Sequence, residues 1–338
     1  MQPFNPNLPL EEASTIPSSW YTNQEIYESE LNTIFYKTWQ LAGRTEQLTE
    51  KDSFFTFNLV NEPIIFTNNG EIKAYSNVCR HKATTLVNEP CGKAAKFRCR
   101  YHGWTYDTCG NLIGTPEFTS VKNFNKKDNC LPEFPVKVSG NFIFVNLTKD
   151  IPFNLDLPDT FNLIWKEQKT YIVNCNWKVF CDNYLDGGYH VGYVHPALAT
   201  AIKYSEYKIE IGNNSVAQTS PLKECGISEL RTGSAGYYWF FPNFMINLYE
   251  GVMDTNLVLP LGIDKCQVIF DFYFSPDKSE EYIKESIKIA DKVQEEDKDI
   301  CEKVQAGLKS KFYNTGRFSV KREKGAYYFH QLLAKELM

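Results

Sequence analysis

The sequence predicts an α+β protein built from two domains, each with an antiparallel sheet. Short runs of β-forming residues, separated by Asn, Gly and Pro turns, occupy residues 41–145. Strand-like runs return at about residues 204–274, and a helical period of apolar residues follows over residues 279–311. A chain of 338 residues is long enough to give each domain its own core. We therefore expect an N-terminal antiparallel β domain, followed by a larger domain of antiparallel sheet with flanking helices.

The predicted domain boundaries follow from changes in pattern along the chain. Residues 1–40 are expected to hold an arm rich in Pro and Asn, and an amphipathic helix from Thr22 to about Gln40. Residues 41–150 form the first β domain, and a segment containing Pro and Asp marks its end. Residues 151–338 form the second domain.

The composition limits the class of function. Apolar residues make up 43% of the chain and the net charge is −5 with mixed signs, which predicts an ordered globular protein with no nucleic acid partner. No apolar run reaches the roughly 18 residues that cross a bilayer, so no membrane partner is expected. The N-terminus lacks a cationic start, an apolar stretch and a cleavage site, which predicts a cytoplasmic protein. In that reducing compartment, clustered cysteines bind metal more often than they form disulfides.

Two Cys/His pairs lie in the first domain. Cys79 and His81 form one pair, and Cys99 and His102 form the other. A zinc site competes for this pattern, but zinc fingers group Cys with Cys and His with His. A [2Fe–2S] centre with two thiolates on one iron and two imidazoles on the other needs one ligand of each type from each loop. The mixed pairs therefore favour the iron–sulfur cluster over zinc.

A second metal-like pattern lies in the second domain, in the stretch NWKVFCDNYLDGGYHVGYVHP. His190 and His195 are spaced so that both rings can reach one metal from a helix, or from a helix that runs into the turn before Pro196. Two structural histidines on a partly buried helix are the competing explanation. The chain has only 5 histidines, however, and all but His330 fall in the two metal-like patterns. This concentration favours metal binding.

Together the two patterns resemble known motifs. The stretch CRH…CRYHGWTYD resembles the Rieske iron–sulfur motif, and NYLDGGYHVGYVH resembles the mononuclear iron motif of the Rieske non-haem iron oxygenases. The resemblance extends from about residue 20 to the end of the chain, and within the family it is strongest to the choline monooxygenases. It implies a Rieske domain and a catalytic domain of the helix-grip type, with a [2Fe–2S] cluster, a mononuclear Fe(II) and a homotrimeric assembly. It also implies O2 as co-substrate and a ferredoxin or reductase as electron donor, since the chain has no dinucleotide-binding fingerprint.

The resemblance also implies a third iron ligand, a carboxylate from the C-terminal helix. Alignment on the Glu that follows it in the family points to Asp297. Composition alone does not distinguish this residue from Glu295, Glu296 and Asp299, for which a solvated charged face is the alternative.

In the family, a further carboxylate just before the first iron histidine bridges the two metal centres. Asp186, four residues before His190, is the candidate here. Asp182, one helical turn earlier, is the alternative. His330, near the C-terminus, has no assigned role.

The resemblance implies choline as the substrate, hydroxylated to betaine aldehyde hydrate. A quaternary ammonium has no hydrogen-bond donor, and aromatic faces attract it. Trp239 and Phe241, in an aromatic segment of the expected pocket sheet, are the candidate substrate-binding residues, with core packing as the alternative for each ring. The competing functions are an oxygenase or demethylase of carnitine or glycine betaine, an aromatic-ring hydroxylating dioxygenase, and an electron carrier without chemistry.

Overall fold

The computed structural model describes residues 4–160, 162–223 and 230–338. The chain divides into two compact units, one of Phe35–Phe153 and the other of Met1–Ile34 with Asn154–Met338. Within the described ranges, no helix has the length and apolar character needed to span a membrane.

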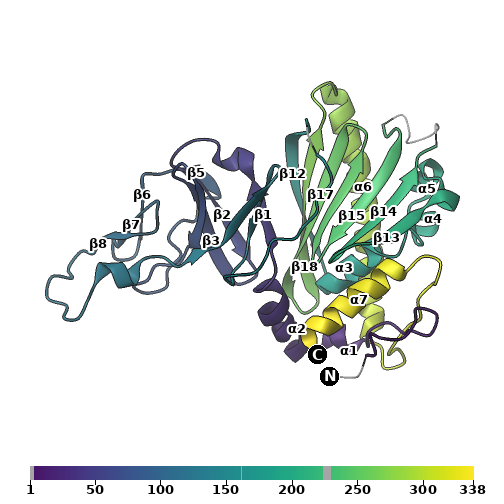
Figure 1. Cartoon of the computed structure of the whole chain (residues 1–338), viewed down its shortest axis with the longest axis horizontal. Helices are drawn as coiled ribbons and strands as arrows, with labels where there is room; N and C mark the ends of the chain where they lie inside the picture. The colour runs from purple at the N-terminus through teal and green to yellow at the C-terminus, as the bar shows by residue number, and fades with distance from the viewer. Residues whose placement is uncertain (1–3, 161, 224–229) are drawn as a thin grey trace. The chain divides into compact units, whose positions relative to one another are not determined.

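The Phe35–Phe153 unit is built of antiparallel strands (Figure 1). A five-stranded sheet has the order β5-β2-β3-β4-β9, and two three-stranded sheets have the orders β1-β11-β10 and β6-β7-β8. The strands are β1 (Gln40–Arg44), β2 (Ser53–Leu59), β3 (Glu62–Asn68), β4 (Ile72–Ser76), β5 (Cys91–Lys93), β6 (Lys96–Arg98), β7 (Thr105–Asp107), β8 (Leu112–Gly114), β9 (Glu133–Phe134), β10 (Val136–Ser139) and β11 (Phe142–Val145), with 3-10 turns at η2 (Thr45–Leu48) and η3 (Lys126–Asn129). This is the N-terminal antiparallel β domain that the sequence predicts.

The core of this unit extends to the two loops that carry the Cys/His pairs. Cys79 and Cys99 are buried in one apolar cluster with Phe97, Trp104 and Tyr106. Phe97 on β6 and Tyr106 on β7 are partners in the antiparallel register, so the loop between these strands is held at both ends. The small sheet therefore fixes the position of the second pair.

The second unit has a single antiparallel sheet of seven strands, in the order β12-β18-β17-β16-β15-β14-β13 (Figure 1). Its elements are α1 (Ser19–Thr22), α2 (Gln24–Glu30), the π-helical turn η1 (Leu31–Phe35), β12 (Ile164–Val173), α3 (Trp177–Tyr184), α4 (Val191–Val194), α5 (Pro196–Ala201), η4 (Tyr204–Glu206), β13 (Lys208–Ile211), β14 (Ser215–Pro221), β15 (Ser234–Phe240), β16 (Phe244–Tyr249), β17 (Val252–Gly262), β18 (Lys265–Phe274), α6 (Glu280–Leu308) and α7 (Lys324–Leu337). The α+β class predicted from the sequence is confirmed.

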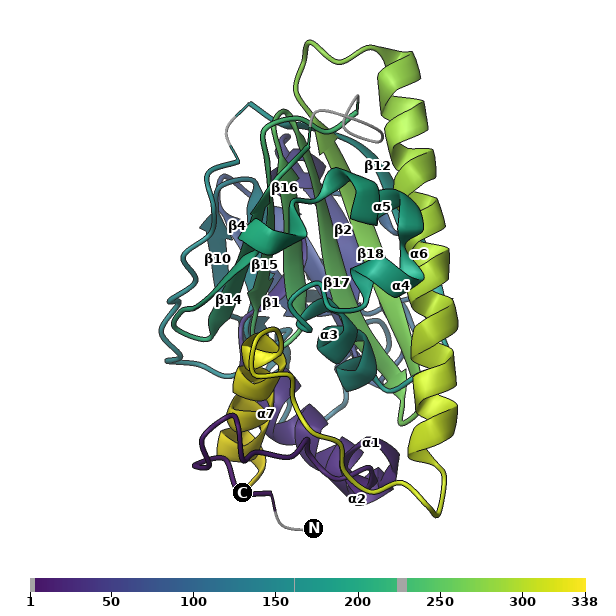
Figure 2. The ribbon, with the colours of Figure 1, turned by 90° about the vertical axis from the view of Figure 1, so that its right-hand side faces the viewer.

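Helices cover one face of this sheet. Figure 2 shows α3, α4 and α5 in front of the sheet, with the long helix α6 running beside them. The helical period over residues 279–311 corresponds to α6, whose first turn is capped by Ser279, because the Tyr282 amide donates to its hydroxyl oxygen at 3.2 Å. The helices that follow β12 thus lie on one face of the sheet, with α6 along their side.

The predicted N-terminal helix is shorter than expected and has a break. Asn23 has an extended backbone and separates α1 from α2, while its side chain accepts hydrogen bonds from Glu25 and Ile26 and so begins the second helix. The helical path ends at Phe35, and Gln40 already belongs to β1. Asn23 therefore ends one helix and begins the next, although the apolar residues follow a continuous helical stripe.

Candidate metal centres and substrate cavity

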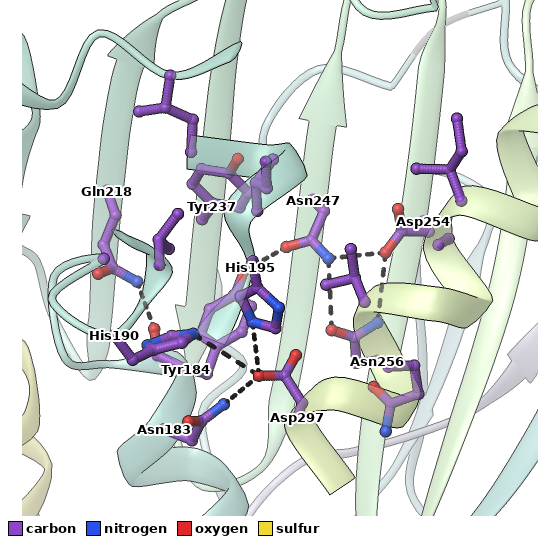
Figure 3. A pocket seen from close by; sticks show the side chains of 18 of the residues that line it. Asn183, Tyr184, His190, His195, Gln218, Tyr237, Asn247, Asp254, Asn256 and Asp297 are labelled. Carbon is purple, nitrogen blue, oxygen red and sulfur yellow. Dashed lines mark hydrogen bonds and ion pairs between the residues drawn. The ribbon is translucent and has the colours of Figure 1, made fainter. Parts of the chain in front are cut away.

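Three side chains from distant segments meet between α4 and α6 (Figure 3). His190 lies just before α4, and His195 lies between α4 and α5, whose first residue is Pro196. Asp297 projects from α6, with its Oδ1 atom 3.0 Å from Nε2 of His195 and 3.6 Å from Nε2 of His190. The three ligand atoms lie within 4.8 Å of one another, a spacing suited to one metal ion. Two histidines and one carboxylate are the donor set of non-haem Fe(II) oxygenases.

Each of these two histidines uses its other ring nitrogen to contact a carboxylate. Nδ1 of His190 lies 2.6 Å from Asp186, and Nδ1 of His195 lies 2.7 Å from Glu296. Because a carboxylate accepts the Nδ1 proton, Nε2 of each ring keeps its lone pair and faces the shared position. The arrangement thus fixes both rings in the tautomer that a metal requires.

The side-chain amide of Asn183 also holds the carboxylate of Asp297. It donates from Nδ2 to Oδ1 of Asp297 at 2.7 Å, from the end of α3. The sequence reasoning missed both this residue and the role of Glu296. No pattern distinguishes Glu296 from its acidic neighbours, whereas Asn183 lies next to Asp182 in a stretch already singled out.

The electrostatic field of the cluster favours a cation. Burial on its own would lower the pKa of His195, but its hydrogen bonds to the carboxylates of Asp297 and Glu296 and the negative charges of these acids outweigh burial, so the pKa is raised. The same acids that favour a proton on the imidazole also favour a metal ion in its place. The residues present therefore fit a divalent metal.

The two acids considered as a bridge have different surroundings. Asp186 contacts His190 through both the ring and the backbone amide, the latter at 2.9 Å. Asp182 instead accepts from the Tyr21 hydroxyl at 2.5 Å and lies 2.9 Å from Nε2 of His330. Because Nδ1 of His330 accepts from the Ile16 amide, Nε2 carries the proton and donates to Asp182. This assigns His330 to a hydrogen-bond network with Asp182 and Tyr21, outside the triad.

The two Cys/His loops of the first unit also bring their residues together. Cys79 and Cys99 are 2% and 3% exposed and their thiols interact, while the rings of His81 and His102 have centroids 4.6 Å apart. Each loop closes by a backbone hydrogen bond, from Cys79 to Thr84 at 2.8 Å and from Cys99 to Trp104 at 2.7 Å. The two thiols thus form one pair and the two imidazoles another.

The first of these histidines has a lone pair available for a metal. Nδ1 of His81 is buried and has no hydrogen-bond partner among the described residues, and its ring stacks on Trp104 at 4.8 Å. Burial, then the charges of His102 and Lys82, lower the pKa of His81, so the ring is neutral as ligation requires. On the thiol side, the Tyr106 hydroxyl lies 3.7 Å from Sγ of Cys79. An orphaned imidazole nitrogen beside paired thiols fits an iron–sulfur cluster.

A cavity of about 140 Å³ opens beside the His190, His195 and Asp297 triad. It is enclosed mainly by aromatic and polar side chains of α3, the sheet and α6 (Figure 3). Those that enter the argument below are Tyr184, Tyr207, Tyr237, Tyr249, Asn247, Asp254, Asn256 and Arg231. The triad thus has room for a small molecule next to it.

The predicted substrate-binding residues do not reach this cavity. Trp239 is fully buried and packs against Phe329 of α7 at 5.3 Å and against Phe241 at 6.0 Å. Strand alternation places Tyr237 and Trp239 on the same face of β15, but the helical layer covers the face at Trp239 and leaves it open at Tyr237. Tyr237 is therefore the residue of β15 that lines the cavity, and Trp239 and Phe241 belong to the core.

Comparison with known families agrees with this geometry. Residues 38–125 match the Rieske [2Fe-2S] domain, and residues 162–221 and 210–337 match the catalytic domain of the ring hydroxylating alpha subunit. The chain belongs to the Rieske non-haem iron oxygenase family. It is accordingly an oxidoreductase of the Rieske monooxygenase type, with a [2Fe–2S] cluster and a mononuclear iron as cofactors. Oxygenases of this family take their electrons from a ferredoxin or a reductase.

Relatives of known activity span more than one amine. The chain is 38% identical to the chloroplastic choline monooxygenase of Arabidopsis thaliana, over 99% of this chain and 85% of that protein. It is 27% identical to the carnitine monooxygenase oxygenase subunit of Escherichia coli, over 96% of this chain and 94% of that one. The crystal structure of the quaternary ammonium Rieske monooxygenase CntA with an inhibitor superposes with a TM-score of 0.88 at 25% identity, covering 99% and 97% of the two chains. The substrate must therefore be argued from the cavity.

Proposed function

We propose that this oxygenase is a choline monooxygenase, which uses O2 and electrons from a ferredoxin or reductase to hydroxylate choline to betaine aldehyde hydrate. The reaction inserts one oxygen atom into a C–H bond of the carbinol carbon, and two electrons and two protons reduce the other oxygen atom to water. The observation that carries the proposal is a tyrosine-lined cavity beside a two-histidine, one-carboxylate triad.

The tyrosines of this cavity suit a quaternary ammonium group. Tyr237 lies nearly parallel to Tyr207 with ring centroids 6.4 Å apart, and Tyr249 stands at 88° to Tyr237. Three rings in two orientations thus line the cavity. Ring faces attract a diffuse cation that cannot donate a hydrogen bond.

In this proposal His190, His195 and Asp297 hold the mononuclear iron, and Cys79, His81, Cys99 and His102 hold the [2Fe–2S] cluster. When bound, these groups supply electron storage and the activation of O2. The chain itself contributes the orientation of each ligand: Asp186 and Glu296 hold the imidazoles, and Asn183 holds Asp297. Tyr106 donates a hydrogen bond toward the Cys79 sulfur, because its oxygen already accepts from the Arg80 amide.

We further propose that Asp186 links the two centres in a homotrimer, where the cluster of one subunit serves the iron of its neighbour. The carboxylate of Asp186 contacts His190 directly and its side chain is 15% exposed, so one edge stays available to an incoming imidazole. Asp182 is already engaged by Tyr21 and His330, which argues for Asp186 as the bridge. We also propose that the protein is cytoplasmic, as its sequence predicts.

A zwitterionic amine such as carnitine is the second candidate. Arg231 lines the cavity, with its guanidinium carbon 4.9 Å from the centroid of Tyr249, and an arginine is the usual partner of a carboxylate. The relationship to the Escherichia coli carnitine enzyme also supports it. The higher identity to a choline enzyme favours choline.

Oxygen uptake by the purified, iron-reconstituted protein tests the proposal. With a generic ferredoxin and reductase, choline, carnitine, glycine betaine and an aromatic acid are added in turn. We expect uptake coupled to betaine aldehyde only with choline, and loss of that uptake in His190→Ala while the Rieske absorbance persists. Coupled uptake with carnitine instead would select the second candidate, and no uptake on any substrate would reject the enzyme assignment.

A further inference from the structure

A buried carboxylate faces the cavity from the sheet. Asp254 on β17 is 5% exposed and lies opposite Asn247 of β16 in the antiparallel register. Its Oδ2 atom accepts from Nδ2 of Asn247 at 2.7 Å and from Nδ2 of Asn256 at 3.4 Å (Figure 3). Its Oδ1 atom has no hydrogen-bond partner among the described residues. Half of this carboxylate therefore remains unsatisfied.

The orientation of the carboxylate is fixed by a chain of hydrogen bonds. The Tyr184 hydroxyl lies 2.8 Å from Oδ1 of Asn247, so the amide nitrogen of Asn247 must face Asp254. Asn256 contacts both partners, with its own Oδ1 atom 3.4 Å from Nδ2 of Asn247. Two amides on neighbouring strands thus hold Asp254 in place without neutralising it.

No cation within the described ranges forms an ion pair with Asp254. Arg231 lines the same cavity, but it lies over the Tyr249 ring and donates to the Leu230 carbonyl at 2.9 Å. Burial dominates the surroundings of Asp254 and raises its pKa, with the two amides and the charge of Arg231 acting in the opposite direction. A buried carboxylate in this situation is stabilised when a cation binds next to it.

We infer that Asp254 determines specificity for a cationic substrate, by placing a fixed negative charge beside the head group that the tyrosines surround. A quaternary ammonium has no N–H, so the carboxylate acts on it through the field alone, and that field is strong in a cavity shielded from water. The inference deepens the proposed function and rests on it. Its consequence is selection by charge: the cavity prefers a cation to a neutral molecule of the same shape.

A purely structural role for Asp254 makes a different prediction. If the carboxylate only orders Asn247 and Asn256, then its replacement disturbs the cavity for every ligand of that shape. Choline and 3,3-dimethylbutan-1-ol separate the two roles, because the alcohol replaces the ammonium nitrogen by carbon and so removes the charge but keeps the shape.

The test measures dissociation constants for both ligands by anaerobic calorimetry on the holoenzyme. We expect Asp254→Asn to weaken choline binding by about tenfold or more, as loss of a close charge in a partly shielded site does, and to change binding of the alcohol less than about twofold. Asp271→Asn is the matched control. Asp271 is a buried acid of β18 that contacts Trp165 and Gln168 and does not line the cavity, so its replacement should leave the ratio of the two constants unchanged.

The possible outcomes separate the inference from the proposed function. Equal weakening of both ligands in Asp254→Asn, or no change in either, would overturn the inference. Tetramethylammonium serves as a probe that does not depend on turnover. If the wild type converts no choline, yet its affinity for tetramethylammonium falls in Asp254→Asn and not in Asp271→Asn, then the proposed function fails and the charge selection by Asp254 stands.

Discussion

The two metal-binding regions of this oxygenase hold their histidines in opposite ways. In the Rieske unit, the His81 ring stacks on Trp104, and its buried Nδ1 atom has no hydrogen-bond partner within the described residues. In the catalytic unit, His190 and His195 each use Nδ1 to contact a carboxylate. Among the described residues, His81 thus lies against an aromatic ring with no acid bonded to it, whereas His190 and His195 lie among acids.

This difference matches the chemistry assigned to each region. Neutral imidazoles in place of thiolates reduce the negative charge on a [2Fe–2S] cluster and raise its potential, so the cluster accepts an electron more easily. Carboxylates behind metal-binding imidazoles strengthen them as donors and add negative charge, so an acidic setting helps to retain Fe(II). The changes that follow should therefore affect one region and leave the other intact.

The largest effect is expected when a ligand of one region is removed. Asp297→Ala leaves two of the three donors, so we expect loss of mononuclear iron. Choline-dependent oxygen uptake should fall by more than the roughly 100-fold expected when a residue that only contacts a ligand is replaced. Iron analysis together with the Rieske absorbance measures both centres at once. Asp299→Ala is the control, because Asp299 lies on the same helix and pairs with Lys303 at 2.5 Å. Full iron content in Asp297→Ala would remove this residue from the ligand set.

A smaller effect is expected from the acid behind His195. Glu296→Gln keeps the shape but removes the charge that His195 contacts, so the affinity for Fe(II) should fall by about tenfold. The matched control is Glu295→Gln, since Glu295 is the preceding residue on α6 and is 3.7 Å from Lys298. Titration of the apoprotein with Fe(II) gives the affinity. An equal loss in both variants would mean that the general charge of α6, rather than the contact with His195, sets the affinity.

Variants of Asp186 and Asp182 test which of these two acids links the two metal centres. Asp186→Asn should slow reoxidation of the reduced cluster in the presence of choline and O2 when the rate is expressed per bound mononuclear iron, because the same change also weakens the hold on His190. Asp182→Asn should leave that rate unchanged but lower the free energy of unfolding by about 1–3 kcal/mol, because the buried Tyr21 and His330 lose a charged hydrogen-bond partner. Stopped-flow absorbance and denaturant unfolding measure the two effects. The reverse pattern would assign the bridge to Asp182.

The smallest effect is expected at Arg231. Arg231 lines the cavity, and its positive charge repels a bound cation. Arg231→Gln should therefore lower the KM for choline by about two- to threefold. For a zwitterionic substrate the guanidinium would instead attract the carboxylate, and the same variant would raise KM. Steady-state oxygen uptake with choline and with carnitine distinguishes the two, and a raised KM for choline would contradict the account of the cavity.

The same contrast explains how far the sequence could lead. The proposed ligands of the cluster lie within two short loops, so their spacing alone suggests them. His190 and His195 are also close in sequence, and the same argument applies to them. Asp297 required a family resemblance, because Glu295, Glu296 and Asp299 have the same composition and only the rotation of α6 decides which acid faces the histidines.

The residues that line the cavity were the hardest to predict from the sequence. Alternation along β15 places Tyr237 and Trp239 on one face, but it gives no information on which helices cover that face. Asn183 and Asp254 gained their roles only when α3, α6 and β17 were placed in space. Contacts made across the fold decide these roles, and one-dimensional spacing does not contain them.

A single-turnover experiment tests the central claim most directly. The holoenzyme, reduced at both centres and freed of excess reductant, is mixed with O2 and choline, and betaine aldehyde is quantified against mononuclear iron. We predict product in proportion to that iron, together with oxidation of the cluster, and no product from Asp297→Ala. Oxidation of the cluster in the wild type without any product from choline would contradict the claim that this cavity and its triad form a choline monooxygenase.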